Sequence, residues 1–278
     1  MLIRIIVGVM LVPLLIAVLF FTPPIVLPVA IGLICSLIVH ELLWQSGFLK
    51  SKVIVCVGMA IAAVVTLWLY FEMTTLLAFF VVFGFTLLIF TVAMSGLVTH
   101  PESEEQITFG QIGGAYFAVF LIPIFLSAIQ SIAHAYKGAY VILLPFCIAF
   151  GTDIMAYFVG VTLGKHRPLK ILSPKKSVEG SIGGLFGSAI FVLSLGFILQ
   201  FGFDQTVNYA WLLVISVTGS LIAQFGDFAF SYIKRGFGIK DYGKLLPGHG
   251  GVLDRFDSII FVAPFVAMMI QVTPVIVL

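Results

Sequence analysis

The sequence predicts an all-α, polytopic integral membrane protein with about nine transmembrane helices and a cytoplasmic N-terminus. Hydrophobic residues make up 61% of the 278-residue chain, and charged residues only 9%. The mean hydropathy is +1.22. A helix needs ~20 apolar residues to cross a bilayer, and within lipid it satisfies its own backbone polar groups. Apolar runs of this length follow one another along the chain, and basic residues cluster between particular runs.

Each apolar run is a candidate span. The nine runs are 5–21, 25–44, 53–70, 74–95, 113–133, 139–161, 183–200, 208–232 and 258–277. The first follows Arg4 as the core of a signal peptide would, but the absence of a small-residue cleavage site favours a retained helix. We divide the chain into four N-terminal spans within 1–112 and a catalytic region, 113–278, with cytoplasmic loops at 162–182 and 233–257.

The basic residues predict the orientation. With the N-terminus in the cytoplasm, every Lys and Arg except Lys137 lies on the inner side, which is 13 of 14. This is the distribution that the positive-inside rule describes. Such a face attracts anionic lipid head groups and phosphates. We therefore expect a multi-pass protein of the inner (cytoplasmic) cell membrane, with an active site facing the cytoplasm, membrane lipids as partners and no nucleic acid.

The N-terminal spans contain few polar residues. Glu41 lies at the inner end of the second span, where we interpret it as a helix-end charge that reaches the interface. The acidic segment 100–106 is interpreted as a solvated loop. We therefore expect the chemistry to lie after residue 150.

The segment GTDIMAYFVGVTLGK, 151–165, places an aspartate inside an apolar run. At 100° per residue, Asp153, Tyr157, Gly160 and Gly164 fall on one helix face. A carboxylate in a span usually faces a polar cavity or a partner. The glycine pair forms a GxxxG, which often serves helix packing alone. Function and packing both remain open for this segment.

The segment KHRPLKILSPKKSVEGSIGG, 165–184, is a basic loop that ends in glycines. Cationic side chains together with backbone N–H groups at a glycine-rich helix N-terminus can bind phosphates. Lys175, Lys176 and Ser177 form the compact core of this loop. The alternative is an ordinary positive-inside loop, and we favour phosphate binding.

A polar stripe runs along the span that ends near residue 232. Gln224, Asp227, Ser231 and Lys234 recur at helical spacing. Asp254 and Asp257 follow where the last span begins, and helix capping would explain these two. Capping does not explain Asp227, whereas a Mg²⁺ site built from carboxylates explains all three.

Cations and glycines surround these aspartates. The cations are Lys234, Arg235, Lys240, Lys244 and Arg255, and the glycines are Gly248, Gly250 and Gly251. The cations would neutralise phosphate oxygens, and the glycines would let the backbone approach closely. This combination indicates phosphoryl or nucleotidyl transfer, in which positioning and charge stabilisation dominate.

The segment 231–257 resembles the signature of the phosphatidate cytidylyltransferase (CDP-diacylglycerol synthase) family. The matching positions are Ser231, Ile233, Lys234, Arg235, Lys240, Asp241, Gly243, Leu246, Pro247, His249, Gly250, Gly251, Asp254, Arg255 and Asp257. The upstream blocks 153–165 and 173–184 are similar to the family as well. Ser177 and Val178 stand where the family usually has Thr and often an aromatic residue.

The resemblance implies that phosphatidate attacks the α-phosphorus of CTP to give CDP-diacylglycerol and pyrophosphate in phospholipid biosynthesis. It implies Mg²⁺ held by Asp227, Asp254 and Asp257, with a second cation such as K⁺. The catalytic set is then these aspartates with Lys240 and Asp241. The substrate-binding set is Lys175, Lys176, Ser177, Ser231, Lys234, Arg235, Lys244, His249, Gly250, Gly251, Arg255, Asp153 and Tyr157.

Other functions remain as alternatives. A CTP-dependent lipid kinase, or a cytidylyltransferase for another lipid phosphate, shares the membrane setting. A cation transporter would also place Asp153 and Asp227 in spans, but it does not need the basic and glycine-rich loops. A homodimer is left open as the oligomeric state.

Overall fold

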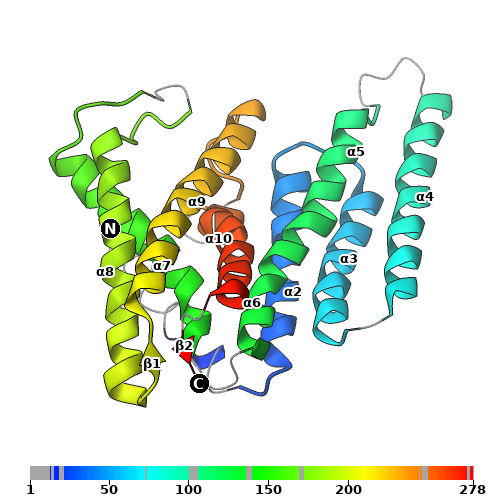
Figure 1. Cartoon of the computed structure of the whole chain (residues 1–278). Helices are drawn as coiled ribbons and strands as arrows, with labels where there is room; N and C mark the ends of the chain where they lie inside the picture. The colour runs from blue at the N-terminus through cyan, green and yellow to red at the C-terminus, as the bar shows by residue number, and fades with distance from the viewer. Residues whose placement is uncertain are drawn as a thin grey trace. The chain divides into compact units, whose positions relative to one another are not determined.

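A computed structural model describes residues 13, 16–18, 22–72, 74–99, 106–135, 140–168, 172–243, 245, 250–273 and 276–277. These residues are almost entirely helical (Figure 1). Eight helices among them are long and apolar enough to cross a membrane. They correspond to the second to ninth predicted spans, which confirms an all-α, polytopic membrane protein. The predicted span 5–21 lies almost wholly outside the described residues, and the orientation stays a prediction.

The chain divides into two compact units. One comprises Met1–Ser127 with Phe237–Arg255, and the other comprises Ala128–Gly236 with Phe256–Leu278. This division by contacts differs from the sequence division at residue 112. The loop at 237–252, which carries most of the family signature and is called the signature loop below, groups with the N-terminal helices. The assignment of catalysis to 113–278 stays a prediction about function.

The first unit is a set of apolar helices. Its elements are α2 (Val26–Val39), the π-helical turn η1 (His40–Gln45), α3 (Lys52–Tyr70), α4 (Thr75–Thr99), α5 (Phe109–Tyr116), the π-helical turn η2 (Phe117–Leu121) and the part of α6 (Ile122–Ala135) up to Ser127. α2 packs on α3, and α5 starts with a capping box formed by Thr108 and Gln111.

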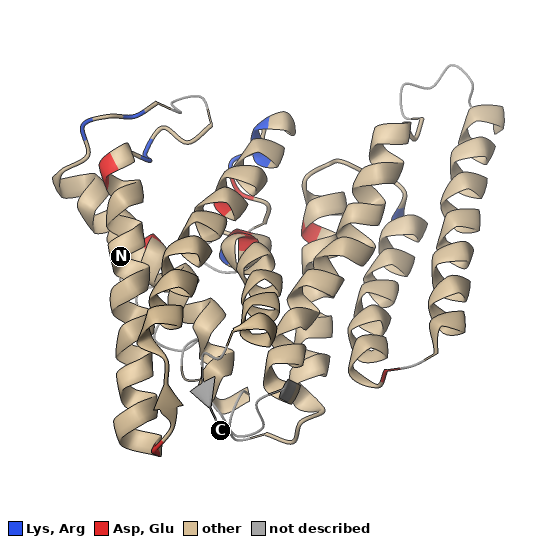
Figure 2. Cartoon of the chain, in the orientation of Figure 1, with Lys and Arg blue, Asp and Glu red and all other residues tan. Residues whose placement is uncertain are grey.

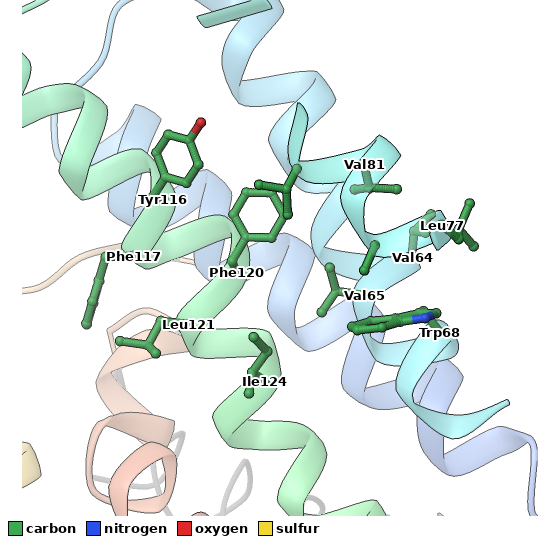
Figure 3. A pocket seen from close by; sticks show the side chains of 12 residues that line it. Val64, Val65, Trp68, Leu77, Val81, Tyr116, Phe117, Phe120, Leu121 and Ile124 are labelled. Atoms are coloured by element: carbon green, nitrogen blue, oxygen red, sulfur yellow. The ribbon is translucent and has the colours of Figure 1, made fainter. Parts of the chain in front are cut away.

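Much of α4 faces outward, as expected of a helix in lipid. Phe79 is 72% exposed and Phe83 is 61% exposed. An apolar pocket of about 490 Å³ lies beside this helix, lined by α3, α4, α5, η2 and α6 (Figure 3). The side chains of Trp68 and Phe120 contribute to its wall. These apolar surfaces agree with a membrane setting for the unit.

The second unit holds the remaining part of α6, η3 (Tyr140–Leu143), α7 (Leu144–Thr162), α8 (Val178–Phe203), α9 (Tyr209–Gly236) and α10 (Leu253–Val272) from Phe256 onward. A short antiparallel pairing joins β1 (Thr206–Val207) to β2 (Ile276–Val277), with Thr206 opposite Val277. α8 packs against both α7 and α9, so three long helices form the body of this unit.

Glycines let α7 and α8 approach closely. A Cβ added to Gly151 would lie 2.9 Å from the carbonyl oxygen of Gly187, and one added to Gly180 would lie 2.8 Å from that of Ala156. Real Cβ atoms do not tolerate such contacts, so the backbones pack where side chains are missing. This interface fixes the start of α8, and with it the end of the basic loop.

Candidate active site

Charged residues of the second unit gather mainly at one end of its helices (Figure 2). The last turn of α9 carries Lys234 and Arg235, and the first turn of α8 carries Glu179. Asp204 lies instead at the C-cap of α8, at the opposite helix end. Within this unit, charged residues are therefore concentrated where α8 begins and α9 ends.

Asp227 is the meeting point of two predicted motifs. Its Oδ1 accepts a hydrogen bond from the Ser231 hydroxyl at 3.2 Å, and its Oδ2 forms an ion pair with the Lys176 ammonium group. The same ammonium group lies 4.1 Å from the centroid of the Phe228 ring. The basic loop therefore reaches the polar stripe of α9, as expected if the two serve one site.

Helix capping explains why the basic loop ends where it does. Ser177 is buried, and its hydroxyl accepts a hydrogen bond from the backbone N–H of Gly180 at 3.1 Å. This is an N-cap, which the hydroxyl of either serine or threonine can supply. Glu179 accepts a hydrogen bond from the N–H of Lys165 at 3.0 Å, and its Oε1 lies 2.5 Å from Nδ1 of His166. The cap places Lys176 directly before α8.

Asp257 lies within the electrostatic influence of other charges in the second unit. It is 8% exposed, and the charges of Asp227, Asp153 and Lys234 act on it. Its Oδ1 accepts a hydrogen bond from the N–H of Ser258 at 2.8 Å. Lys234 is 9% exposed, so a cation is buried near this group of carboxylates. Buried charges of this kind require partners, and this unit supplies both signs.

The carboxylates fit a hard divalent cation chemically. Oxygen donors such as those of Asp227 and Asp257 suit Mg²⁺, which takes its other ligands from water and substrate phosphates. Within the described ranges, no group of three His, Cys, Asp or Glu side chains has the arrangement of a metal site. Asp227 and Asp257 are therefore chemically suitable donors, and the three-aspartate metal site stays a prediction.

In the first unit, Asp254 holds the signature loop. Its Oδ2 accepts hydrogen bonds from the N–H of Tyr242 at 3.0 Å and from that of Gly251 at 2.9 Å. α10 begins at Leu253, five residues before the predicted span at 258, so Asp254 is the second residue of the helix. It is not the N-cap residue, and the two backbone N–H groups that its carboxylate binds belong to the loop before the helix.

Steric constraints explain why the signature loop has glycine at position 250. Gly250 has φ +87°, a conformation that other residues rarely adopt. A Cβ on Gly250 would also lie 2.9 Å from Oδ2 of Asp254. The bend that this glycine permits brings the N–H of Gly251 to Asp254.

The remaining predicted residues are mostly exposed to solvent or lipid. Exposed side chains are those of Asp153, Tyr157, Lys175, Arg235, Lys240, Asp241 and Arg255. Arg235 donates a hydrogen bond to the carbonyl oxygen of Leu172 at 3.4 Å, which is a second link between α9 and the basic loop. Lys244 and His249 lie outside the described residues.

One expectation about α7 requires correction, and the structure gives a packing reason for glycines of α7 and α8. α7 ends at Thr162, so Gly164 does not share a helix face with Asp153. Gly160 is buried against α8, whereas Tyr157 is 66% exposed, which favours packing for the glycine. Gly180, Gly183 and Gly184 also face neighbouring helices closely, so packing accounts for them without a phosphate.

The interpretation of Glu41 as an interfacial charge is wrong. Its side chain is 1% exposed, and it accepts hydrogen bonds from the N–H groups of Val252 and Leu253. A carboxylate inside an apolar run is itself a signal of a buried polar role. Its partners, however, lie more than two hundred positions later and could not be inferred from local sequence.

A model of the cytidylyltransferase family matches residues 2–273. The chain belongs to the cytidylyltransferase family. It is 42% identical over 135 residues to a phosphatidate cytidylyltransferase of Staphylococcus aureus (strain COL), which covers 48% of this chain and 50% of the relative. It is 34% identical over 179 residues to one of Staphylococcus haemolyticus, covering 64% and 67%. The chain thus spans about half the length of the first of these curated relatives.

Each of the two units of this cytidylyltransferase-family protein contains polar residues of the family motifs. In the second unit, Lys176 and Ser231 contact Asp227, and the charged side chains of Lys234 and Asp257 are buried in the same unit. In the first unit, Asp254 and the loop glycines form a hydrogen-bonded turn at the start of α10. Both groups consist of residues that the family resemblance identified, and each is built by contacts within its own unit.

Proposed function

We propose that the protein is a phosphatidate cytidylyltransferase, which transfers the cytidylyl group of CTP to phosphatidate. Family membership and the names of its relatives support this. The observation that carries the proposal is the ion pair between Lys176 and Asp227, in the same unit as the buried Lys234 and Asp257. A lysine that can bind phosphate and a carboxylate that can bind a divalent cation are thus in contact, which supports a nucleotide-phosphate site.

The reaction needs no general base. A phosphate oxygen of phosphatidate is already anionic at neutral pH and attacks the α-phosphorus of CTP. A new P–O bond forms there, the bond from the α-phosphorus to the bridging oxygen breaks, and pyrophosphate leaves with that electron pair. Most of the barrier then comes from bringing two anions together, which cations in fixed positions can lower.

The cations divide between the two substrates. Lys175, Lys176, Lys240 and Lys244 bind the triphosphate of CTP, and Lys234, Arg235 and Arg255 bind the phosphate of the lipid or the leaving pyrophosphate. The ion pair with Asp227 holds the Lys176 side chain over α9, which reduces the side-chain entropy lost when a phosphate binds. The side chain of Lys240 is exposed, so CTP can reach it.

The carboxylates of Asp227 and Asp257 would hold Mg²⁺, and the family resemblance implies Asp254 as a further ligand and K⁺ as a second cation. When bound, the divalent cation neutralises phosphate charge and polarises the phosphorus–oxygen bonds. Ser231 and Lys176 orient Asp227 through its two oxygens. Removing the negative charge from Asp227 therefore disturbs both the metal and the lysine.

The active site lies on the cytoplasmic side of the cell membrane, where CTP is available, and the lipid substrate enters from the bilayer. The basic residues on the loops 162–182 and 233–257 support this orientation through the positive-inside rule. The exposed apolar side chains along the helices provide the lipid-facing surface.

An assay for transferred cytidine tests the proposal. Purified protein in detergent is incubated with phosphatidate, Mg²⁺ and CTP labelled in the cytidine. We expect label to enter the chloroform-soluble fraction, to depend on phosphatidate, and to stop when EDTA removes the metal. Asp227→Asn should abolish the transfer while the protein stays folded, whereas Asp204→Asn, the same change at an exposed C-cap, should not. Transfer by Asp227→Asn at the normal rate would remove Asp227 from the site.

A further inference from the structure

Glu41 is a buried carboxylate whose partners lie in the signature loop. It belongs to the π-helical turn η1, which continues α2, and its side chain is 1% exposed. Its Oε1 accepts a hydrogen bond from the N–H of Val252, and its Oε2 accepts one from the N–H of Leu253, both at 2.9 Å. Both oxygens of one carboxylate thus bind consecutive backbone amides of a segment far away in the sequence.

These two amides belong to the start of α10. The first N–H groups of a helix have no acceptor within the helix, and a side chain close in sequence usually supplies one. Here the residue before the helix is Val252, whose side chain cannot accept a hydrogen bond. Glu41 supplies the acceptor instead, and its negative charge also complements the positive end of the helix dipole.

The glycines of the signature loop make room for Glu41. A Cβ on Gly243 would lie 2.6 Å from Oε1 of Glu41, and a Cβ on Gly251 would also overlap the carboxylate. Both glycines are buried. Two separate parts of the loop therefore pack directly against this one side chain, which fixes the loop by shape as well as by hydrogen bonds.

The turn that Glu41 binds is the turn that presents Asp254. Asp254 accepts the N–H of Gly251, which is the neighbour of the amides bound by Glu41, and the N–H of Tyr242. Consecutive backbone amides from 251 to 253 thus bind two carboxylates of different elements. A substitution at Glu41 should therefore first alter the conformation of this turn and the position of the Asp254 side chain.

We infer that Glu41 is a positioning residue: it fixes the signature turn 250–254 and, through it, the Asp254 carboxylate and the adjacent Arg255. The inference rests on the proposed function, because it assigns a role in catalysis to this turn. Glu41 acts only through the backbone of the turn and does not contact the substrate. A carboxamide in its place would set an N–H donor against a backbone N–H donor, which removes one of the two hydrogen bonds and leaves a buried amide unpaired.

The experiment compares Glu41→Gln with Glu72→Gln, which removes the same charge at an exposed turn. Both are made in a background without Cys35, Cys56 and Cys147. A cysteine replaces the buried Val252 in one set of proteins and the buried Ala118 in another, and the rate of thiol labelling is measured in detergent. Cytidylyl transfer is measured in the same Glu41→Gln and Glu72→Gln variants without the reporter cysteines.

We expect Glu41→Gln to accelerate labelling at 252 at least about tenfold without changing it at 118, and to lower kcat about tenfold or more at saturating CTP. Glu72→Gln should change neither. Faster labelling at both positions would show a general structural role, and unchanged labelling at 252 or an unchanged kcat would each overturn the inference. If the unmodified protein transfers no cytidylyl group, the proposed function fails, and the labelling result still decides whether Glu41 fixes the turn.

Discussion

Lys176 and Asp227 form an ion pair that joins the basic loop before α8 to the polar stripe of α9. The contact brings together two motifs that lie far apart in the sequence. The ring of Phe228 lies beneath the same ammonium group. The positive-inside rule does not by itself explain a contact with the polar stripe, so the pairing supports a role for the loop in the site.

Lys176→Ala tests that role. We expect kcat/KM for CTP to fall by about ten- to a hundredfold, because a charge-assisted contact to phosphate is lost. The dependence on phosphatidate should change little. Steady-state kinetics with each substrate varied in turn make the measurement. Lys165→Ala, at another exposed lysine of the same loop, is the control and should leave both unchanged. Kinetics like those of the unmodified protein in Lys176→Ala would reduce the loop to an orientation signal.

Asp254→Asn separates metal binding from loop capping. The amide oxygen can still accept hydrogen bonds from Tyr242 and Gly251, so the turn should persist. The neutral oxygen is a poor Mg²⁺ ligand, so we expect activity to fall more than about a hundredfold. Activity and the unfolding temperature are measured on the same preparation. Retained activity with a lower unfolding temperature would instead favour capping as the whole function of Asp254.

Gly151→Ala tests the close approach of α7 and α8. The added Cβ would lie 2.9 Å from the carbonyl oxygen of Gly187, so the helices would have to separate. Overpacking of this kind costs about 1–3 kcal/mol. We expect a lower unfolding temperature in detergent. Gly96→Ala on α4 meets nothing within 4 Å and should be neutral or slightly stabilising. Equal effects at the two positions would argue against the packing account.

Cysteine labelling tests the orientation. We expect cysteines at the exposed Lys175 and Lys240 to resist an impermeant thiol reagent in intact cells and to react once the inner face is opened. A cysteine at the exposed Thr74, after α3, should show the opposite pattern. The background again lacks the native cysteines. Labelling of position 175 from outside would contradict the nine-span orientation. The basic loop would then lie on the opposite side of the membrane from cytoplasmic CTP.

Hydropathy alone predicted the eight described spans, because a bilayer demands long apolar helices with internal hydrogen bonds. It placed the start of the last helix too late. α10 begins at Leu253, but Asp254, Arg255 and Asp257 in its first turns lower the local hydropathy. A search for apolar runs therefore leaves out a helical turn that consists of polar residues.

The candidate site was predicted in its chemistry more than in its contacts. The spacing of Asp227 and Ser231 correctly placed them on one face of α9, since helical periodicity is a local property. The function of Glu41 could not be predicted, because its hydrogen bonds join distant segments. The glycines of α8 were ambiguous for a different reason: phosphate binding and helix packing both require a missing side chain.

The position of the label in the product tests the central claim most directly. Purified protein is given phosphatidate, Mg²⁺ and CTP labelled either at the α-phosphorus or at the γ-phosphorus, and the lipid and aqueous fractions are counted. Cytidylyl transfer predicts that the α-label enters the lipid and that the γ-label leaves as pyrophosphate. Entry of the γ-label into the lipid would show a CTP-dependent kinase instead, and entry of neither label would contradict nucleotidyl transfer altogether.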